Sequence, residues 1–298
     1  MKKKIVAILA PTGMLGSMVY KELKDTYRLV LVYRDAKKLT TLNRAYGDVR
    51  DHKRIRFDLT SLYSDYTNGF PNANIGPQAK KLVSAIGFVD AMINCAGITK
   101  PHSIKNPTVT MFINGVLPHI LSAVYGQNLI QITTDCAFSG VSGAPYDEDT
   151  HKTPTDLYGL SKSIGEPGTT SLVLRTSIIG PEIEGHTMLL DWFRNQEGNT
   201  IQGFTNHLWN GITTKEFARI CDRVIRKKNK YPKTGLFHIF STPISKYDML
   251  VAFKRKYGVN VTIQPVKAPI GVDRRLKTHY PLCGTLHIPG FSKMLTAL

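Results

Sequence analysis

The 298-residue sequence predicts an α/β fold in which a doubly wound parallel sheet carries a smaller C-terminal α/β lobe. Before Arg175, short apolar runs alternate with amphipathic segments, and this strand–helix–strand repetition is typical of parallel sheets with right-handed crossovers. Beyond Arg175 the periodicity weakens, although two more amphipathic helices are expected. A hydrophobic content of 42% suffices for one large core and a smaller lobe.

Each predicted strand is a short run, mostly apolar, and each predicted helix has apolar residues at helical spacing. The strands are Ile5–Leu9, Leu29–Tyr33, Arg54–Phe57, Ala91–Cys95, Leu129–Thr133 and Leu172–Leu174. The helices are Met14–Lys24, Val109–Tyr125, Thr214–Lys227 and Ser245–Tyr257. The stretch Leu59–Pro77 contains several loop-forming pairs, so a long surface loop is expected there.

The first predicted strand runs into the sequence APTGMLG, residues 10–16, and a helix follows. Gly13 lets the backbone approach a pyrophosphate, Gly16 lets the helix pack on the strand, and the helix N-terminus attracts negative charge. This context favours a dinucleotide site over a glycine turn without a ligand. Its expected contacts are Ala10, Thr12, Gly13, Met14 and Leu15.

Arg34 and Asp35 follow the second strand, where the adenosine ribose of a dinucleotide lies. An acidic residue there binds free ribose hydroxyls, whereas an arginine accommodates a 2′-phosphate. Because Arg34 comes first and its surroundings are basic, the sequence favours NADP over NAD, unless Arg34 is an ordinary loop cation. Asp58, after the third strand, is a candidate adenine contact, although such aspartates often simply begin a turn.

Tyr-x-x-x-Lys occurs three times, as Tyr20/Lys24, Tyr33/Lys37 and Tyr158/Lys162. Only the third pair follows the fifth strand, where the edge of a nucleotide crevice is expected. Its spacing of four residues places both side chains on one face of a helix. Tyr158 can protonate the alkoxide formed when hydride adds to a ketone, and Lys162 is expected to lower the tyrosine pKa and hold the nicotinamide ribose. Thr134, at the end of the fifth strand, is expected to bind the carbonyl oxygen or, alternatively, to tie off the strand.

Seven short motifs follow one another in a specific order, and the resemblance that they carry runs from Ile5 to about Tyr257. They are APTGMLG (10–16), INCAG (93–97), FINGVLP around Asn114, TTDCAFSG (133–140), YGLSK with Gly165-Glu166, LRTSIIG (174–180) and WNGITT (209–214). With them the chain resembles the extended short-chain dehydrogenase/reductases, and among these the dTDP-4-dehydrorhamnose reductase type.

The resemblance implies a Rossmann-type dinucleotide-binding domain over residues 1–170 and a lobe, mainly substrate-binding and interleaved with the sheet, over 171–298. It places the catalytic groups at Thr134, Tyr158 and Lys162, further cofactor contacts at Cys95, Ala96 and Gly97, and a usually structural asparagine at Asn114. The implied reaction is reduction of a nucleotide-linked 4-keto-6-deoxy sugar. Residues 169–298 hold 19 basic and 8 acidic residues, and this charge suits a diphosphate substrate.

Two departures from the family pattern bear on function. Ala10 stands where the family has its first loop glycine, which is tolerable if that position needs no positive φ. Cys136 stands where related GDP-fucose synthases have an epimerisation base, so a bifunctional epimerase–reductase with His186 as candidate acid is an alternative to a buried cysteine. A non-catalytic regulator resembling the regulatory subunit of methionine adenosyltransferase is the other alternative.

In the lobe, Trp209 and Asn210 are candidate nucleotide or sugar contacts, and Arg274 and Arg275 a candidate diphosphate clamp. Each could instead be a core or surface residue.

The net charge of +17 also raises nucleic-acid binding, but no nucleic-acid motif is present and no such partner is expected. The four cysteines form no CxxC pair, so no metal site or disulfide framework is expected and a cytoplasmic location fits. The apolar run at residues 5–10 is too short for a signal peptide or a membrane span, so no membrane association is expected. A homodimer is left open.

Overall fold

The computed structural model describes residues 2–67 and 76–298. Its centre is a seven-stranded sheet in the order β11–β6–β5–β4–β1–β2–β3, in which every neighbouring pair is parallel. The strands are β1 (Ile5–Leu9), β2 (Arg28–Tyr33), β3 (Lys53–Arg56), β4 (Ala91–Asn94), β5 (Leu129–Thr133), β6 (Leu172–Arg175) and β11 (Gly235–His238). The predicted doubly wound α/β fold is confirmed, and β11 is an additional strand beside β6.

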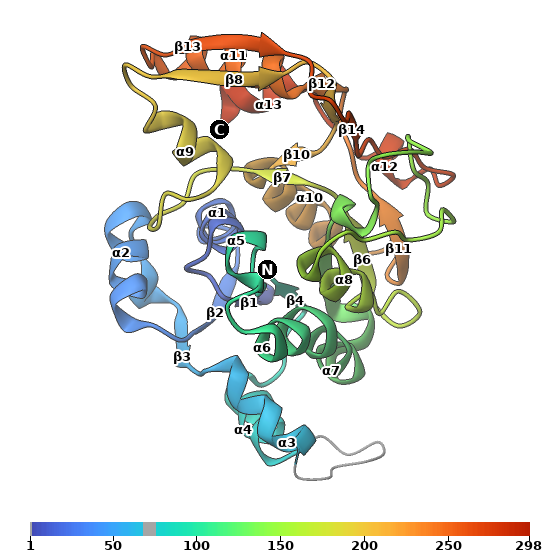
Figure 1. The fold of residues 1–298 in the computed structure, drawn as a ribbon. Coiled ribbons are helices and arrows are strands. Elements are labelled where there is room, and N and C mark those ends of the chain that lie inside the picture. The colour runs from blue at the N-terminus through green and yellow to red at the C-terminus, as the bar shows by residue number, and fades with distance from the viewer. Residues whose placement is uncertain (1, 68–75) are drawn as a thin grey trace.

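Helices cover both faces of this sheet (Figure 1). Along β1, Val6 and Ile8 point into one layer while Ala7 and Leu9 point into the other, as strand alternation requires. The first layer contains α1 (Met14–Leu23), α2 (Ala36–Tyr46) and α10 (Thr214–Arg226). The second contains α4 (Pro77–Ile86), α6 (Pro107–Met111) and α7 (Leu117–Tyr125).

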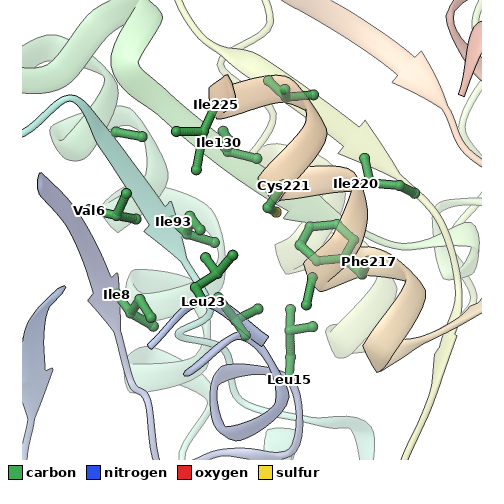
Figure 2. Packing of buried hydrophobic residues seen from close by; sticks show 14 of the residues in the cluster. Val6, Ile8, Leu15, Leu23, Ile93, Ile130, Phe217, Ile220, Cys221 and Ile225 are labelled. Atoms are coloured by element: carbon green, nitrogen blue, oxygen red, sulfur yellow. The ribbon is translucent and has the colours of Figure 1, made fainter. Parts of the chain in front are cut away.

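Helix α10 belongs to the C-terminal part of the chain but packs on the large sheet. Figure 2 shows its residues Phe217, Ile220, Cys221 and Ile225 above side chains of β1, β4 and β5. Thr213 begins the helix by accepting a hydrogen bond from the Glu216 amide at 3.2 Å. Because burying a large apolar side chain contributes about 1.5–3 kcal/mol, this helix joins the two parts of the chain firmly.

The segment from α6 to α7 is continuous helix apart from a π-helical turn at Phe112–Val116. Its run Pro107–Asn128 is long and apolar enough, by length and composition alone, to cross a membrane, but half of the apolar window is buried inside the protein. In the fold this run packs against β4, β5 and the helix that carries Tyr158.

The predicted loop Leu59–Pro77 is partly helical. A 3₁₀ turn covers Leu59–Leu62, α3 covers Tyr63–Thr67 and α4 begins at Pro77, while residues 68–75 lie outside the described part. Asp65 accepts hydrogen bonds from the amides of Gln78 and Ala79, at 3.2 and 2.9 Å, and so caps α4 from a distant turn. The loop-forming residue pairs in this stretch did not predict that the Asp65 side chain caps α4.

The smaller lobe is built from short strands and has its own apolar core. Strand β8 (Thr200–Phe204) pairs with β13 (Thr262–Val266), β9 (His207–Trp209) lies between β12 (Ile244–Ser245) and β14 (Val272–Asp273), and β7 (Ile178–Ile179) pairs with β10 (Ile212–Thr213). Its helices are α9 (Leu189–Arg194), α11 (Lys246–Tyr257) and α13 (Phe291–Ala297). The remaining helices are α5 (Lys100–Ser103), α8 (Leu157–Ile164) and α12 (Leu282–Thr285). Figure 1 shows the β8–β13 pair with α11 and α13 at one end of the molecule, beyond β7 and β10.

Candidate functional site

The loop after β1 turns sharply at Ala10. Ala10 has a φ of 54°, in the left-handed region, and its carbonyl accepts a hydrogen bond from the Gly13 amide at 3.2 Å. A Cβ atom on Gly16 would lie only 2.1 Å from the same carbonyl oxygen, so this position requires glycine. Alanine was expected to be tolerable at position 10 only if that position needs no positive φ. Because the φ of Ala10 is positive, this condition is not met.

This loop and the first turn of α1 form a cradle that suits a pyrophosphate. Gly13 is exposed and precedes the helix without a side-chain cap, and the first turn contains no acidic residue. A Cβ atom on Gly13 would meet only the Ala10 oxygen, at 3.7 Å, so the fold itself does not need glycine there. The missing side chain instead leaves free the space in front of the helix N-terminus, where an anion is favoured.

The other expected contacts of this loop differ in accessibility. Thr12 and Met14 are half-buried, and Met14 lines the adjoining cleft. Leu15 is buried in the core below α1, so only its backbone faces the cradle.

We predict that Ala10→Gly stabilises the protein by about 1 kcal/mol. The left-handed conformation costs a residue with a Cβ atom roughly 1–2 kcal/mol, of which the greater chain entropy of unfolded glycine offsets a part. Urea unfolding of the two proteins measures the difference. Gly198→Ala is the opposite case and should lose stability, because Gly198 has a φ of 73° and open space around it. Equal stability of the Ala10→Gly and wild-type proteins would contradict the strain at Ala10.

A basic hollow lies at the carboxyl ends of β2 and β3. It is lined by Arg34, Asp35, Ala36, Lys37 and Arg56. Asp35 caps α2 by accepting from the amides of Lys37 and Lys38, at 2.7 and 3.3 Å, and these bonds lower its pKa. The Arg56 Nε donates to the Arg34 carbonyl at 3.2 Å, which brings a second guanidinium to this corner. Arg56 and Lys37 were not predicted as site residues because each sits singly in an ordinary strand or helix pattern.

Asp58 begins a turn in the structure, the alternative already given for it. Its Oδ1 accepts hydrogen bonds from the amide and hydroxyl of Thr60, at 3.0 and 2.9 Å. Since this oxygen is occupied locally, Asp58 does not depend on an adenine for partners, and its role as a cofactor contact stays a prediction.

Thr134 and Tyr158 are brought together by two closely packed elements. Thr134 follows β5 and its hydroxyl accepts from the Cys136 amide at 3.2 Å. Helix α8 approaches this turn through Gly159, where a Cβ atom would lie 2.2 Å from the Cys136 carbonyl. Asp156 caps α8 by accepting from the Gly159 amide at 2.8 Å. As a result the Tyr158 phenol lies near the Thr134 hydroxyl, close enough for the threonine to affect the pKa of the tyrosine.

The pKa of Tyr158 differs from the expectation. Burial raises it above the ordinary value of 10, the neighbouring Cys136 raises it further, and the nearby Thr134 hydroxyl opposes the shift. Lys162 was expected to lower it, but its ammonium donates to the Ile132 carbonyl at 2.9 Å. The phenol is therefore fully protonated at neutral pH, as a proton donor must be.

Lys162 is itself a perturbed group. It is buried, and loss of hydration lowers the pKa of its ammonium to about 8, while Glu166 and Cys95 oppose the decrease. The segment Cys95–Gly97 runs beside it, because a Cβ atom on Gly97 would lie 3.9 Å from the lysine Nζ. Cys95 is half-buried and Ala96 is buried, so Gly97 is the exposed member of the segment.

Asn114 connects the chain after Gly97 to helix α8 through side-chain hydrogen bonds. Its amide donates to the Ile98 carbonyl at 2.9 Å and accepts from the Ile98 amide at 2.8 Å, and it also contacts the Ser161 hydroxyl at 3.1 Å. Asn114 is fully buried in the π-helical turn. It therefore positions the Gly97 segment against α8, in agreement with the structural role that the resemblance implies.

A buried ionic network lies beside β5. Glu166 binds Arg175 through two hydrogen bonds, at 3.0 and 2.7 Å, and Arg175 contacts the His238 ring at 2.8 Å. The Thr133 hydroxyl lies 2.9 Å from the Glu166 carboxylate and 3.2 Å from the Lys162 carbonyl. The network thus links β5, β6 and β11 directly behind Thr134 and Lys162.

A cleft of about 420 Å³ opens between the sheet and the lobe, and Asp135 and Cys136, which directly follow Thr134, are part of its lining. Its polar lining consists of Lys100, Asp135, Cys136, Ser177, His207, Lys246 and Arg274, and its apolar lining includes Met14, Ile179, Leu189, Trp209 and Met249. Burial raises the pKa of the Cys136 thiol to about 12, so that thiol is not ionised at neutral pH. Burial also raises the pKa of Asp135, although Arg274 opposes the shift.

The lobe residues expected to bind substrate separate into two groups. Trp209 and Arg274 line the cleft, and Arg274 is held there by hydrogen bonds to the carbonyls of Phe138 and Ser139, at 3.0 and 3.2 Å. Arg275 binds Asp273 instead, with contacts of 2.7–3.0 Å, because successive residues of an extended segment point to opposite sides. The predicted double-arginine clamp therefore reduces to Arg274.

Asn210 and His186 do not line the cleft. Asn210 is buried, and its amide group donates to the Leu276 carbonyl at 2.8 Å and accepts from the Leu276 amide at 2.9 Å. His186 is exposed on the loop between β7 and α9, in a left-handed conformation with a φ of 49°. The first is a structural residue, and the second is not placed to serve Cys136 as an acid.

No group of three or more His, Cys, Asp or Glu side chains is placed to hold a metal ion within residues 2–67 and 76–298. The four cysteines are free.

Sequence comparison finds a family model and several curated relatives that match the chain. The family model of the RmlD substrate binding domain matches residues 75–275. The chain is 25% identical to methionine adenosyltransferase 2 subunit beta of Xenopus laevis over 291 residues, 90% of this chain and 77% of that protein. It is 37% identical to the dTDP-4-dehydrorhamnose reductase of Streptomyces griseus over 79 residues, 25% of this chain and 26% of that enzyme.

Solved structures show the same fold. The dTDP-4-dehydrorhamnose reductase of Bacillus anthracis, in complex with NADP, superimposes with a TM-score of 0.71 at 20% identity, covering 100% of this chain and 98% of that one. This similarity agrees with the Rossmann-type sheet described above.

Proposed function

Because the chain belongs to the RmlD substrate-binding family of extended short-chain dehydrogenase/reductases, a family of oxidoreductases, we propose that it reduces the 4-keto group of a nucleotide-linked 4-keto-6-deoxy sugar. The observation that carries the proposal is the placement of Tyr158 and Lys162 one turn apart on α8, near Thr134, which directly precedes Asp135 and Cys136 in the lining of a cleft large enough for part of a nucleotide sugar. The relatives' names support the substrate class, since those of Streptomyces griseus and Bacillus anthracis are dTDP-4-dehydrorhamnose reductases.

In the proposed reaction the substrate carbonyl oxygen accepts hydrogen bonds from Thr134 and Tyr158. The loop after β1 and Lys162 would hold a nicotinamide cofactor, which would supply the hydride for the new C–H bond at the carbonyl carbon. The carbonyl oxygen takes the Tyr158 proton, so that one C=O becomes CH–OH, and water returns a proton to the phenolate. Lys162 provides a cation beside the ribose position and, with its pKa of about 8, is mostly protonated at pH 7.

We propose NADPH as the preferred cofactor, because the hollow where the ribose would lie presents Arg34, Lys37 and Arg56. Asp35, the acid that would prefer a free ribose, already accepts two backbone hydrogen bonds. Arginine recognises phosphate through paired donors, and two of them flank this hollow.

We predict that Arg56→Ala weakens NADPH binding roughly 10- to 100-fold while NADH binding changes less than about twofold, since each good charge-assisted contact contributes about 1.5–3 kcal/mol. Fluorescence titration with both cofactors measures this. Arg44→Ala is the matched control, because it removes the same charge from an exposed site near the end of α2. An equal loss for NADH and NADPH would argue against a 2′-phosphate site.

The test of the proposed function is reduction of freshly prepared dTDP- and UDP-linked 4-keto-6-deoxy sugars with NADPH, followed by analysis of the product configuration. Oxidation of NADPH with retention of configuration at the carbons flanking the ketone is expected. Inverted centres would support the epimerase–reductase alternative, against which the un-ionised Cys136 thiol argues. Normal cofactor binding without reduction of any of these sugars would contradict the proposal.

A second candidate function is regulatory. It is favoured by the match to methionine adenosyltransferase 2 subunit beta over 90% of this chain and by the strained Ala10 in the cofactor loop. A regulator would co-purify with a partner enzyme and change that enzyme's kinetics, whereas a reductase turns over alone. We prefer the reductase because Thr134, Tyr158 and Lys162 are all present, with Tyr158 and Lys162 on one helix and Thr134 directly after β5.

A further inference from the structure

The motif Gly165-Glu166 has no part in the proposed reaction, yet its glutamate occupies a buried and fully engaged position. Gly165 directly follows α8, and a Cβ atom there would lie 2.0 Å from the Asn114 carbonyl oxygen, so this position requires glycine. The next side chain, that of Glu166, packs against Arg175, and the two are only 4% and 2% exposed. The close packing at Gly165 therefore fixes where the carboxylate enters the protein.

Stability alone does not explain the Glu166–Arg175 pair. Two buried charges lose much of their hydration, and such a pair is often no more stabilising than apolar residues of similar volume. Burial alone would raise the pKa of Glu166, but Arg175 and the exposed Lys152 lower it below its ordinary value. Arg175 also contacts the His238 ring at 2.8 Å, and loss of hydration lowers the pKa of that histidine. The network thus keeps one carboxylate ionised inside the protein.

Glu166 is linked to the end of β5 through the Thr133 hydroxyl. This hydroxyl lies 2.9 Å from the Glu166 carboxylate and 3.2 Å from the Lys162 carbonyl. The peptide that joins Ile132 to Thr133 carries the carbonyl to which the Lys162 ammonium donates, at 2.9 Å. Glu166 and Lys162 therefore hold the same peptide from two sides, one residue before Thr134.

Glu166 also acts on the charge of Lys162. Two titratable groups oppose the effect of burial on this ammonium, Glu166 from the turn after α8 and Cys95 from the segment after β4. Burial raises the pKa of the Cys95 thiol, so that thiol is neutral at pH 7. The negative charge that opposes the decrease of the Lys162 pKa to about 8 is therefore that of Glu166. Without this charge the buried ammonium would lose its proton closer to neutral pH.

We propose that Glu166 is a positioning residue for the proposed reduction, which fixes the last peptide of β5 through Thr133 and keeps the Lys162 ammonium protonated. The inference rests on the proposed function, because the charge of Lys162 matters only if a nicotinamide cofactor binds beside it. Among the described residues Glu166 is not part of the cleft lining, so it acts through Lys162 and not on the substrate.

Titration of Lys162 tests the proposal without any substrate. In protein labelled with [ε-13C]lysine, the Lys162 signal is identified by its loss in Lys162→Met, and its chemical shift is followed from neutral to alkaline pH. We expect Glu166→Gln to lower the wild-type midpoint of about 8 by roughly one pH unit, because a close opposite charge typically has at least this effect. Glu166→Asp disturbs the packing but keeps the charge, and its midpoint should stay nearer to that of the wild type.

Glu216→Gln is the matched control. Glu216 is also buried and pairs with an arginine, Arg223, at 2.5 Å, but it lies on α10, which packs on α1, whereas α8 packs on α6. The Lys162 midpoint of Glu216→Gln should equal that of the wild type.

NADPH binding gives a second readout with its own pH signature. If the midpoint falls from 8 to 7, the protonated fraction of Lys162 decreases about fivefold at pH 8 but by less than about a tenth at pH 6. Fluorescence titration of Glu166→Gln should therefore show NADPH affinity reduced up to about fivefold at pH 8 and nearly unchanged at pH 6. A purely structural defect would weaken binding equally at both pH values, and that result would overturn the inference.

The outcomes separate the role of Glu166 from the proposed function. An unchanged Lys162 midpoint in Glu166→Gln, or one equally low in Glu166→Asp, shows that the charge of Glu166 has no such role, and the proposed function stands. If Glu166→Gln does not fold because Arg175 is left unpaired, the double variant with Arg175→Met removes both buried charges and should show the same direction of change. A lowered midpoint in a protein that reduces no nucleotide-linked keto sugar contradicts the proposed function and not the effect of Glu166 on Lys162.

Discussion

Replacement of Tyr158 by phenylalanine is expected to lower kcat for carbonyl reduction about a thousandfold while NADPH binding stays within a factor of two. Burial raises the pKa of the Tyr158 phenol, which therefore carries a proton at neutral pH, and phenylalanine removes that proton while keeping the ring. General acid catalysis by a positioned side chain typically contributes 10²–10⁴-fold. Stopped-flow measurement of NADPH oxidation, with cofactor titration in parallel, separates the two effects.

Tyr280→Phe is the control for this change, because Tyr280 is exposed and packs edge-on against Phe237, remote from the cleft lining. It should keep wild-type kinetics. The wild-type rate should also fall as the pH rises through about 8, where Lys162 loses its proton, since the site then lacks its cation. Near-normal turnover by Tyr158→Phe would remove the tyrosine from the catalytic role.

Gly16→Ala is expected to lower the free energy of unfolding by roughly 3 kcal/mol, at the upper end of the usual cost of overpacking. The new Cβ atom would lie 2.1 Å from the Ala10 carbonyl oxygen and 2.9 Å from the Pro11 Cα, both of which are backbone atoms that cannot rotate away. The better helix propensity of alanine returns less than about 1 kcal/mol. Urea unfolding monitored by circular dichroism measures the loss.

Gly13→Ala is the matched comparison three residues earlier. Its Cβ atom would make an ordinary contact at 3.7 Å, and the φ of −82° suits any residue, so stability should change by less than about 0.5 kcal/mol. NADPH binding should nevertheless weaken more than tenfold, because the Cβ atom enters the space where the pyrophosphate approaches the backbone. If Gly13→Ala bound NADPH normally, the cradle would not be the dinucleotide site.

The large sheet could be predicted from the sequence because buried parallel strands read as apolar runs, as Ile5–Leu9 and Leu129–Thr133 do. The strand β11 was missed because its sequence, Gly-Leu-Phe-His, is short and follows a weakly periodic segment. The two- and three-residue strands of the lobe, such as β12 and β14, carry no period long enough to detect.

The residues of the candidate site also fall into a group that the sequence could predict and a group that it could not. Thr134, Tyr158 and Lys162 could be recognised from motif order, although the motif did not show that the Lys162 ammonium donates to the Ile132 carbonyl. Arg56 and Lys246 could not, because a lone basic residue on a strand or helix usually indicates solvent exposure, and only the fold shows what surrounds it. Asn210 and Arg275 were mistaken for ligands because their partners, Leu276 and Asp273, become visible only when the backbone path of the lobe is known.

The pairing of β6 with β11 has a consequence for protein engineering. The chain leaves the large sheet after β6, builds part of the lobe, and returns to the sheet at β11, where His238 meets Arg175 and, through it, Glu166. A chimera joined at a single crossover near residue 170 would therefore pair a foreign β6 and β11 with a native β5 and separate Glu166 from Arg175. Substrate preference is better exchanged by grafting the short segments that line the cleft, around residues 177–190, 207–209, 246–249 and 272–274, onto an unchanged sheet.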